Sequence, residues 1–431
     1  MGLTDIASGQ AVLAPLLDIR WPQPGLAEQM VTVAWQWLVL VAVIAWMGTL
    51  IAQSRLHAAF RGTQRPEISA ILYIAAQRQR RQSWLWVMIV LAGTGMLFWL
   101  QLADLLPQQQ LNQPLDWPVL ETFLIQTPEG WLWLARGCLA LLAVALLARL
   151  SLSARRQGRL VHAVDQAKRT STDGTSDEVA PTRGRSPRTG RLSSHLTDRL
   201  ASAQQRLPGE TYSVRLGLVV AGALLLTLVL AHPMLSVAPL PATTLALTGA
   251  VLLTLAVWLG EVLYLAFILV PATRVIENAE RTQTLVELLP ATGPALAQVL
   301  GAMTLYSIFA VETHAVSFIS LSALLSTPAS WILLEELSLL GGILLLALYQ
   351  RQRILPHLTR MAWLAARGTV MSVWGGIDVS RSLQIPQQER QRRAERAEQR
   401  LIRITRIQAV LGVLMLLCLV LASSSLMPAG A

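Results

Sequence analysis

Eight apolar runs of about 20 to 30 residues constrain this chain more than any other feature of its sequence. Because each helical residue advances about 1.5 Å, such a run can cross a hydrocarbon layer roughly 30 Å thick. Hydrophobic residues make up 53% of the 431 positions and charged residues only 14%, which excludes an ordinary soluble enzyme. The predicted fold is therefore an all-α, polytopic membrane helix bundle of about eight transmembrane helices. The predicted spans are residues 31–52, 84–105, 130–150, 213–232, 241–270, 296–320, 331–350 and 408–427.

Short motifs recur in the same order in two halves of the chain. They are Trp46–Gly48, Thr127–Trp131 and Leu228–Ala231 in the first half, and Trp258–Gly260, Thr327–Trp331 and Leu419–Ala422 in the second. The offsets between matching motifs are similar (258 − 46 = 212, 327 − 127 = 200, 419 − 228 = 191), and changes in loop length explain the differences. Four spans in each half give both halves the same orientation. The sequence therefore predicts two parallel four-helix repeats related by an axis along the membrane normal, with a site at their interface.

The arginines gather in alternate loops, as the topology of a membrane protein requires. The first loop carries Arg55, Arg61, Arg65, Arg78, Arg80 and Arg81, whereas Asp104, Asp116, Glu121 and Glu129 surround the second connection. The first loop is therefore predicted inside and both termini outside. The net charge of +10 is attributed to this topology, so the expected partner is the lipid bilayer and no nucleic acid is expected.

The spans and loops divide the chain into seven segments. An outer N-terminal segment, expected to be retained in the mature chain, is followed by spans one to three, a basic disordered inner linker, and span four, which closes the first repeat. Spans five to seven, a basic inner helical segment, and the last span with an outer C-terminus complete the chain. In this order, the seven segments are residues 1–30, 31–150, 151–212, 213–232, 233–350, 351–407 and 408–431.

Two stretches of the basic inner segment carry predictions of their own. The mixture of Arg, Glu and Gln from Gln387 to Arg406 predicts one helix that continues into the last span. Residues 361–379 are predicted to lie flat at the membrane interface. If they span the membrane instead, the C-terminus lies inside.

Charged residues within the apolar spans are candidates for function, because each costs about 2.5 to 3.5 kcal/mol on insertion scales. They are Arg136, Glu261, Glu312, Glu335 and Glu336. Arg136 and Glu336 hold equivalent places in the two halves, so an ion pair at the repeat interface is expected, either for packing or within a permeation path. Glu261 is expected to be a neutral, hydrogen-bonded acid or a proton relay or cation ligand.

Histidine and methionine near the outer face could bind a soft metal ion. His232 and Met234 follow the fourth span and His314 lies in the sixth, so a copper entry site is one hypothesis and ordinary boundary histidines are the other. Two axial imidazoles could also hold a haem, but no second pair lies at inner depth for electron transfer, so haem is not expected.

Some of these motifs resemble a known family. A span with Trp-x-Gly, and one that opens with Thr-x-x-Gly followed six positions later by a basic residue, resemble the membrane domain of CopD-type copper-resistance proteins. The matching residues are Trp46, Gly48, Thr127, Gly130 and Arg136 in the first half and Trp258, Gly260 and Thr327 in the second. The resemblance implies copper transport or handling across the bacterial cytoplasmic membrane.

A copper-binding protein on the outer face or another membrane subunit is the expected protein partner. Enzymatic activity is not expected, because the sequence has no nucleotide-binding loop, catalytic triad or metal-protease motif. The alternative function is a non-transporting scaffold or accessory subunit of a larger membrane complex.

Overall fold

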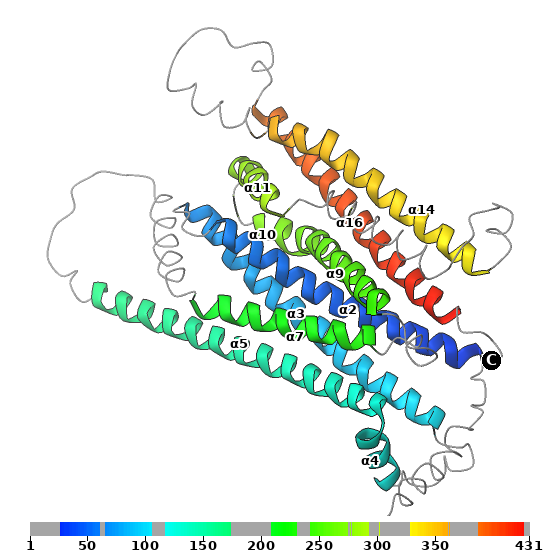
Figure 1. The fold of residues 1–431 in the computed structure, drawn as a ribbon. Coiled ribbons are helices and arrows are strands. Elements are labelled where there is room, and N and C mark those ends of the chain that lie inside the picture. The colour runs from blue at the N-terminus through cyan, green and yellow to red at the C-terminus, as the bar shows by residue number, and fades with distance from the viewer. Residues whose placement is uncertain are drawn as a thin grey trace, which may run out of the picture.

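Long helices that run roughly along one direction make up the molecule (Figure 1). The computed structural model describes residues 26–60, 65–105, 117–173, 208–230, 242–274, 276, 278–292, 301, 328–360, 362 and 387–425. Within these ranges the regular elements are helices and no strand occurs. The prediction of an all-α chain is confirmed for the described residues. Helices suit an apolar chain because every backbone N–H and C=O within the span finds its partner in the same helix.

The helices differ widely in length, and several are longer than a bilayer requires. In chain order they are α2 (Leu26–Ala59), α3 (Pro66–Leu105), α4 (Trp117–Gln126), α5 (Pro128–Asp173), α7 (Pro208–Leu230), α9 (Ala242–Tyr264), the π-helical turn η2 (Leu265–Leu269), α10 (Val270–Thr273), α11 (Asn278–Thr292), α14 (Pro328–Tyr349), the π-helical turn η3 (Gln350–Ile354) and α16 (Gln387–Ser425).

Five of these helices are long and apolar enough to cross a membrane. The candidate spans are Met30–Ala59, Glu67–Ala103, Pro128–Leu152, Thr248–Thr273 and Arg392–Leu421, with a shorter apolar helix at Val214–Leu230. Helix α14 occupies the predicted span at 331–350. The predicted span at 296–320 lies, apart from Gly301, outside the described residues.

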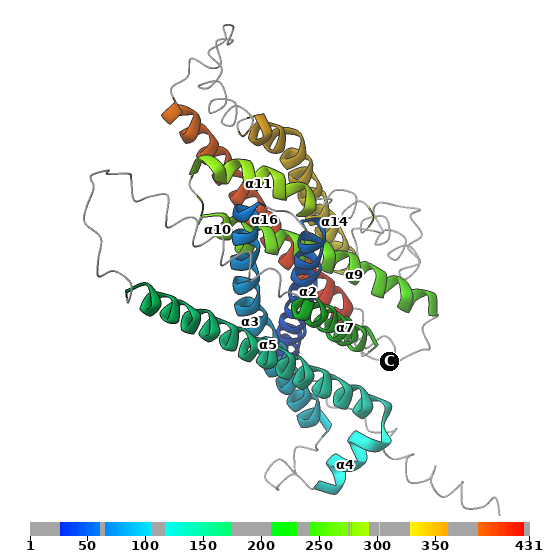
Figure 2. The ribbon, with the colours of Figure 1, turned by 90° about the vertical axis from the view of Figure 1, so that its left-hand side faces the viewer.

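Helix α2 lies at the centre of the bundle. It packs against α3, α7, α9 and α16, and it stands between α3 and α9 in both views (Figures 1 and 2). Helix α5 lies on one side of this centre against α3 and α7, and α14 lies on the opposite side against α16 (Figure 1). We call the end of the bundle where α2 ends and α3 begins the inner end, following the arginine distribution, and the other end the outer end.

A second buried cluster continues the bundle beyond its apolar middle at the inner end. It joins Leu56 of α2, Ile71 of α3, Leu269 of η2, Leu288 of α11 and Leu401 of α16. The predicted first loop is accordingly mostly helical, because α2 continues to Ala59 and α3 begins at Pro66.

Ion pairs hold the short helix α11 against its neighbours at the inner end. Arg65, just before α3, lies 2.7 Å from Glu287 of α11. Arg281 of α11 pairs with Glu398 of α16, and both side chains are largely buried, with exposed fractions of 14% and 6%. Burial lowers the pKa of Arg281, the charge of Arg274 lowers it further, and Glu395 opposes the shift.

The described part of the basic linker and the last helix have definite structure. The linker predicted at 151–212 begins as helix, because α5 continues without a break to Asp173, and α7 begins at Pro208. The prediction of disorder was therefore wrong for 151–173, where Gly and Pro are rare enough for the helix to continue. Helix α16 is continuous from Gln387 to Ser425, as its sequence pattern predicted. The predicted interfacial stretch at 361–379 lies, apart from Ala362, outside the described residues.

Candidate functional site at the crossing of α2 and α9

Two glycines allow α2 and α9 to touch backbone to backbone. A Cβ on Gly48 would stand 1.9 Å from the carbonyl oxygen of Ala256, and a Cβ on Gly260 would stand 2.1 Å from the Cα of Gly48. No other residue fits at either position without moving a helix, because real Cβ atoms do not approach backbone so closely. The glycines of the two Trp-x-Gly motifs therefore meet each other at one crossing point.

The tryptophans of the same motifs are buried beside the crossing. Trp46 is 1% exposed and Trp258 is 2% exposed, and neither indole Nε1 has a hydrogen-bond partner among the described residues. The ring of Trp258 packs against α16, where a Cβ on Gly412 would come within 2.9 Å of it. An unpaired buried donor costs about 1 to 3 kcal/mol, so the two indole N–H groups lie in an unfavourable environment.

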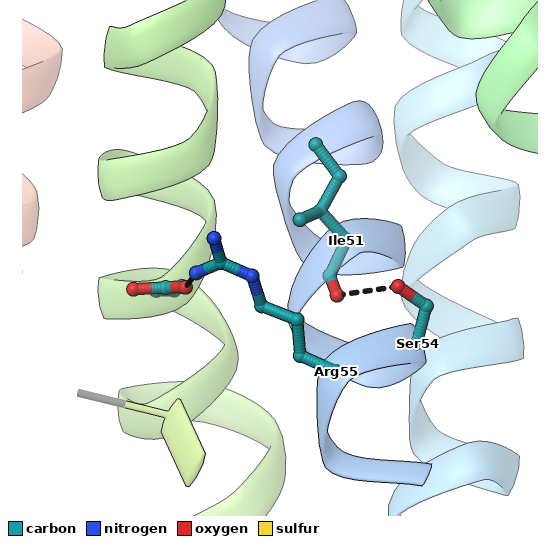
Figure 3. Close-up of polar contacts among 4 residues, drawn as sticks. Ile51, Ser54 and Arg55 are labelled. Carbon is teal, nitrogen blue, oxygen red and sulfur yellow. Dashed lines mark hydrogen bonds and ion pairs between the residues drawn. The ribbon is translucent and has the colours of Figure 1, made fainter. Parts of the chain in front are cut away.

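A partly buried ion pair joins the same two helices on the inner side of the crossing. The guanidinium of Arg55 reaches from α2 towards α9 (Figure 3), where it pairs with the carboxylate of Glu261. The Glu261 side chain is 2% exposed and the Arg55 side chain is 41% exposed. Glu261 is therefore paired with an arginine side chain, whereas the sequence expectations were a neutral acid, a proton relay or a ligand of a passing cation.

Arg55 is the residue of this candidate site that the sequence did not reveal, because it was assigned to topology alone. Side chains on a helix point back towards the N-terminus, so an arginine placed one or two turns deeper can reach the level of Glu261. The signal that could have revealed the pair is the seven-residue spacing from Gly48 to Arg55, two turns on the same face of α2.

Three more polar side chains, from α2, α3 and α9, are buried near the crossing. Together with the pair they define what we call the polar seam, which is Thr49, Arg55, Gln79, Glu261 and Tyr264. The Gln79 side-chain amide donates a hydrogen bond of 2.8 Å to the Thr49 hydroxyl, which in turn donates one of 2.7 Å to the Ala45 carbonyl oxygen. Gln79 Oε1 and the Tyr264 hydroxyl are buried and have no partner among the described residues.

The polar seam lies next to an irregular turn of α9. The π-helical turn η2 follows Tyr264 directly, and Val270 N–H bonds there to the Leu265 carbonyl oxygen, one residue further back than in an α-helix. Pro271 comes next and has no N–H to continue the ladder. Such wide turns within helices are frequent at functional sites.

Arg136 is buried between α5 and α7 and serves as a cap. Its guanidinium donates a hydrogen bond of 2.7 Å to the Thr227 carbonyl oxygen and lies 4.8 Å from the centre of the Trp133 ring. Thr227 stands in the last turn of α7, whose carbonyls lack partners within the helix and carry the negative end of the dipole. Among the described residues, this buried cation is stabilised by a carbonyl oxygen and an aromatic ring and not by a carboxylate.

The expected pairing of Arg136 with Glu336 does not fit this arrangement. Arg136 belongs to α5 and Glu336 to α14, and these helices lie on opposite sides of the bundle, with α2, α9 and α16 between them (Figure 1). Equivalent places in two repeats need not meet, because only residues near an axis of symmetry contact their own counterparts.

The Thr-x-x-Gly motif of the first half forms a corner between α4 and α5. The Gly130 N–H donates a hydrogen bond of 3.0 Å to the Thr127 hydroxyl, which donates one of 2.6 Å to the Phe123 carbonyl oxygen. A Cβ on Gly130 would lie 2.2 Å from the same carbonyl oxygen. The motif is thus an N-cap with a close helix contact.

The remaining predicted site residues lie outside what the structure describes. They are His232, Met234, Glu312, His314 and Thr327, together with the side chain of Glu336. Among the described residues no group of three or more His, Cys, Asp or Glu side chains could hold a metal ion. The hypothesis of a copper site at His232, Met234 and His314 stays a prediction.

Comparisons with protein-family models, with curated proteins and with solved structures find no match to this chain. The resemblance to CopD-type proteins therefore depends on its short motifs alone.

Proposed function

We propose that the chain is built from two four-helix repeats that meet at the crossing of α2 and α9. The packing of the described helices supports this, because exchanging α2 with α9, α7 with α16, and α5 with α14 turns one packed pair into another. The pair α2 and α7 becomes α9 and α16, the pair α5 and α7 becomes α14 and α16, and the pair α7 and α9 becomes α16 and α2. The contact between Gly48 and Gly260 is what a twofold axis through the crossing requires.

The function we propose for this assembly is transport or handling of a small solute across the bacterial cytoplasmic membrane, along the polar seam. The observation that carries the proposal is the ion pair between Arg55 and Glu261, whose carboxylate is 2% exposed within a candidate membrane span. Ionisable groups inside a membrane are costly, and they commonly mark ion or solute pathways.

Copper is the solute we propose first, on the strength of the CopD-type resemblance. Copper(I) prefers thioether, thiolate and imidazole ligands. The apolar cluster around the crossing contains the buried thioethers of Met47 and Met415, which are 2% and 6% exposed. A further set of copper ligands is proposed at His232, Met234 and His314. The proposed function is transport without a catalysed chemical reaction. A copper-binding protein on the outer face would deliver the ion.

The test is copper accumulation in vesicles that contain the purified protein. We expect the wild-type protein to accelerate accumulation, Glu261→Gln to slow it, and the matched change Glu121→Gln, at an exposed position of α4, to leave it unchanged. Zinc and manganese in separate runs identify the solute. If vesicles with and without the protein accumulate every ion at the same rate, transport is overturned.

The second candidate is the non-transporting scaffold or accessory subunit. It is favoured by one observation, the length of α5 and α16 beyond the apolar part of the bundle. Helix α5 has 46 residues and α16 has 39, so they measure roughly 70 and 60 Å, about twice the hydrocarbon thickness. Such extensions at the inner end offer a surface for another subunit. A protein that binds a membrane partner and moves no ion would support this function.

We propose that both termini face the outside. Reporter enzymes fused to each terminus, one active only outside the cytoplasm and one fluorescent only inside it, test the orientation. Activity of the outer reporter at both ends is the expected result, and fluorescence at the C-terminus would indicate that 361–379 spans the membrane.

A further inference from the structure

One exposed stripe of α16 changes its chemistry abruptly along the helix. Its exposed residues include Arg392, Arg396, Arg400, Arg403 and Arg406 at the inner end, followed at once by the exposed aliphatic residues Ile407, Val410 and Leu414. Apart from the adjacent Arg406 and Ile407, these positions follow one another at intervals of three or four residues, so they lie on one side of the helix. The opposite side is buried, with Leu401, Thr405 and Gln408 among its residues.

The exposed side chains of α14 and η3 also change from apolar residues to arginine at a corresponding place. Leu337, Leu345 and Tyr349 of α14 are exposed, and the next exposed residues along the chain include Arg351 and Arg353 of η3. Helix α16 packs against both α14 and η3, and Ile354 of η3 shares a buried cluster with Leu401 and Ile402 of α16. The two segments therefore present arginine side by side at the inner end of the bundle.

These changes mark the inner membrane boundary. An exposed aliphatic stripe is stable in the hydrocarbon layer, and an arginine stripe is stable beside the lipid phosphates at the surface of that layer. The guanidinium of Arg406 also lies 5.9 Å from the centre of the exposed Phe267 ring on η2, which places an aromatic ring at this level.

We propose that Arg351, Arg353, Arg403 and Arg406 form a binding site for the headgroup of an anionic phospholipid in the leaflet at the inner end. Charge complementarity favours this occupant, because no carboxylate pairs with these arginines in the described ranges. Nearby acidic residues have other partners, Glu398 with Arg281 and Glu389 with Arg393. Guanidinium groups bind phosphate oxygens through paired hydrogen bonds, which lysine does not provide.

Depth decides which arginines of the stripe take part. Headgroups occupy roughly 5 to 8 Å on each side of the hydrocarbon. Arg403 lies four residues from Ile407, or about 6 Å along the helix, whereas Arg396 lies eleven residues away, or about 16 Å. The site therefore includes Arg403 and Arg406 and leaves Arg392 and Arg396 in water. A soluble acidic partner would instead favour the outlying pair.

Two double variants on the same helix test the site with equal changes of charge. The full-length protein in uncharged detergent is titrated with phosphatidylglycerol, phosphatidylcholine of the same acyl chains, and inorganic phosphate, and its thermal unfolding midpoint is recorded. Native mass spectrometry measures the phosphatidylglycerol retained. We expect phosphatidylglycerol alone to raise the midpoint. R403Q/R406Q should weaken its binding roughly 30-fold, since each arginine near the surface contributes about 1 kcal/mol.

The control variant R392Q/R396Q should bind phosphatidylglycerol within about threefold of wild type, because both arginines lie more than a Debye length from the boundary. R403K/R406K should fold and recover part of the binding, which separates lost charge from lost structure. Equal weakening by the two glutamine variants would overturn the site. A wild-type protein that does not prefer phosphatidylglycerol, or that responds as strongly to inorganic phosphate, would overturn it too.

Discussion

Gly48 and Gly260 approach so closely that neither has room for a methyl group, since a Cβ on Gly260 would stand 2.1 Å from the Cα of Gly48. The two glycines lie at equivalent places in two motifs more than two hundred residues apart. The packing of α2 against α9, the nearby ion pair of Arg55 with Glu261 and the proposed relation between the halves all depend on this contact.

The first prediction concerns this contact. Gly48→Ala should lower the free energy of unfolding by about 3 kcal/mol or more, because the new methyl group meets backbone that cannot rotate away. Thermal unfolding of the purified protein in detergent measures the loss. Gly95→Ala is the control, since a Cβ there meets nothing within 4 Å. It should be neutral or stabilise the helix by up to about 1 kcal/mol. Similar midpoints for the two variants would contradict the crossing.

The second prediction concerns the order of effects at the ion pair. Arg55→Gln should cost about 3 to 5 kcal/mol, because it leaves the buried Glu261 carboxylate without its cation. Glu261→Gln should cost less, since the Arg55 side chain is 41% exposed and can turn to water. The double variant should cost less than the sum. Arg149→Gln, at an exposed position of α5, is expected to stay within about 0.5 kcal/mol of wild type. Equal costs for the two single variants would count against the pair.

The third prediction concerns Arg136. Arg136→Met should lower stability by about 2 to 3 kcal/mol, because it removes a charged hydrogen bond to the end of α7 and a contact with the Trp133 ring. Exchange of charges, Arg136→Glu with Glu336→Arg, should restore nothing, because α5 and α14 lie on opposite sides of the bundle. Thermal unfolding of the single and double variants decides the matter, and recovery in the double variant would revive the pair expected from the sequence.

The fourth prediction concerns the inner end. Arg281→Met and Glu398→Met should each cost about 3 to 5 kcal/mol, since either change leaves a largely buried charge alone. The lowered pKa of Arg281 indicates that burial already destabilises its charged form, so loss of Glu398 should lower the free energy of unfolding strongly. The double Met variant should recover most of the loss. A double-mutant cycle with no coupling would show that the pair does not hold α11 to α16.

Sequence reasoning succeeded for the helices themselves. Runs of about 20 apolar residues have one stable form in lipid, so α2, α3, α5, α9 and α16 could be placed from the order of residues. It also marked Trp46, Gly48, Trp258 and Gly260 as equivalent. It made these helices too short, because hydropathy marks only the apolar part, whereas α3 begins already at Pro66 and α5 continues to Asp173 through polar sequence.

The neighbours of each helix were decided by the tertiary structure alone. In lipid both the packed and the exposed faces of a helix are apolar, so periodicity does not reveal which face meets which partner. The sequence accordingly paired Arg136 with Glu336 by equivalence, whereas the fold pairs Arg55 with Glu261 by proximity. Helix α16 illustrates the contrast, because its N-terminal half is rich in arginine and the alternation of Arg with buried Leu401 and Ala397 marks the packed face in the sequence itself.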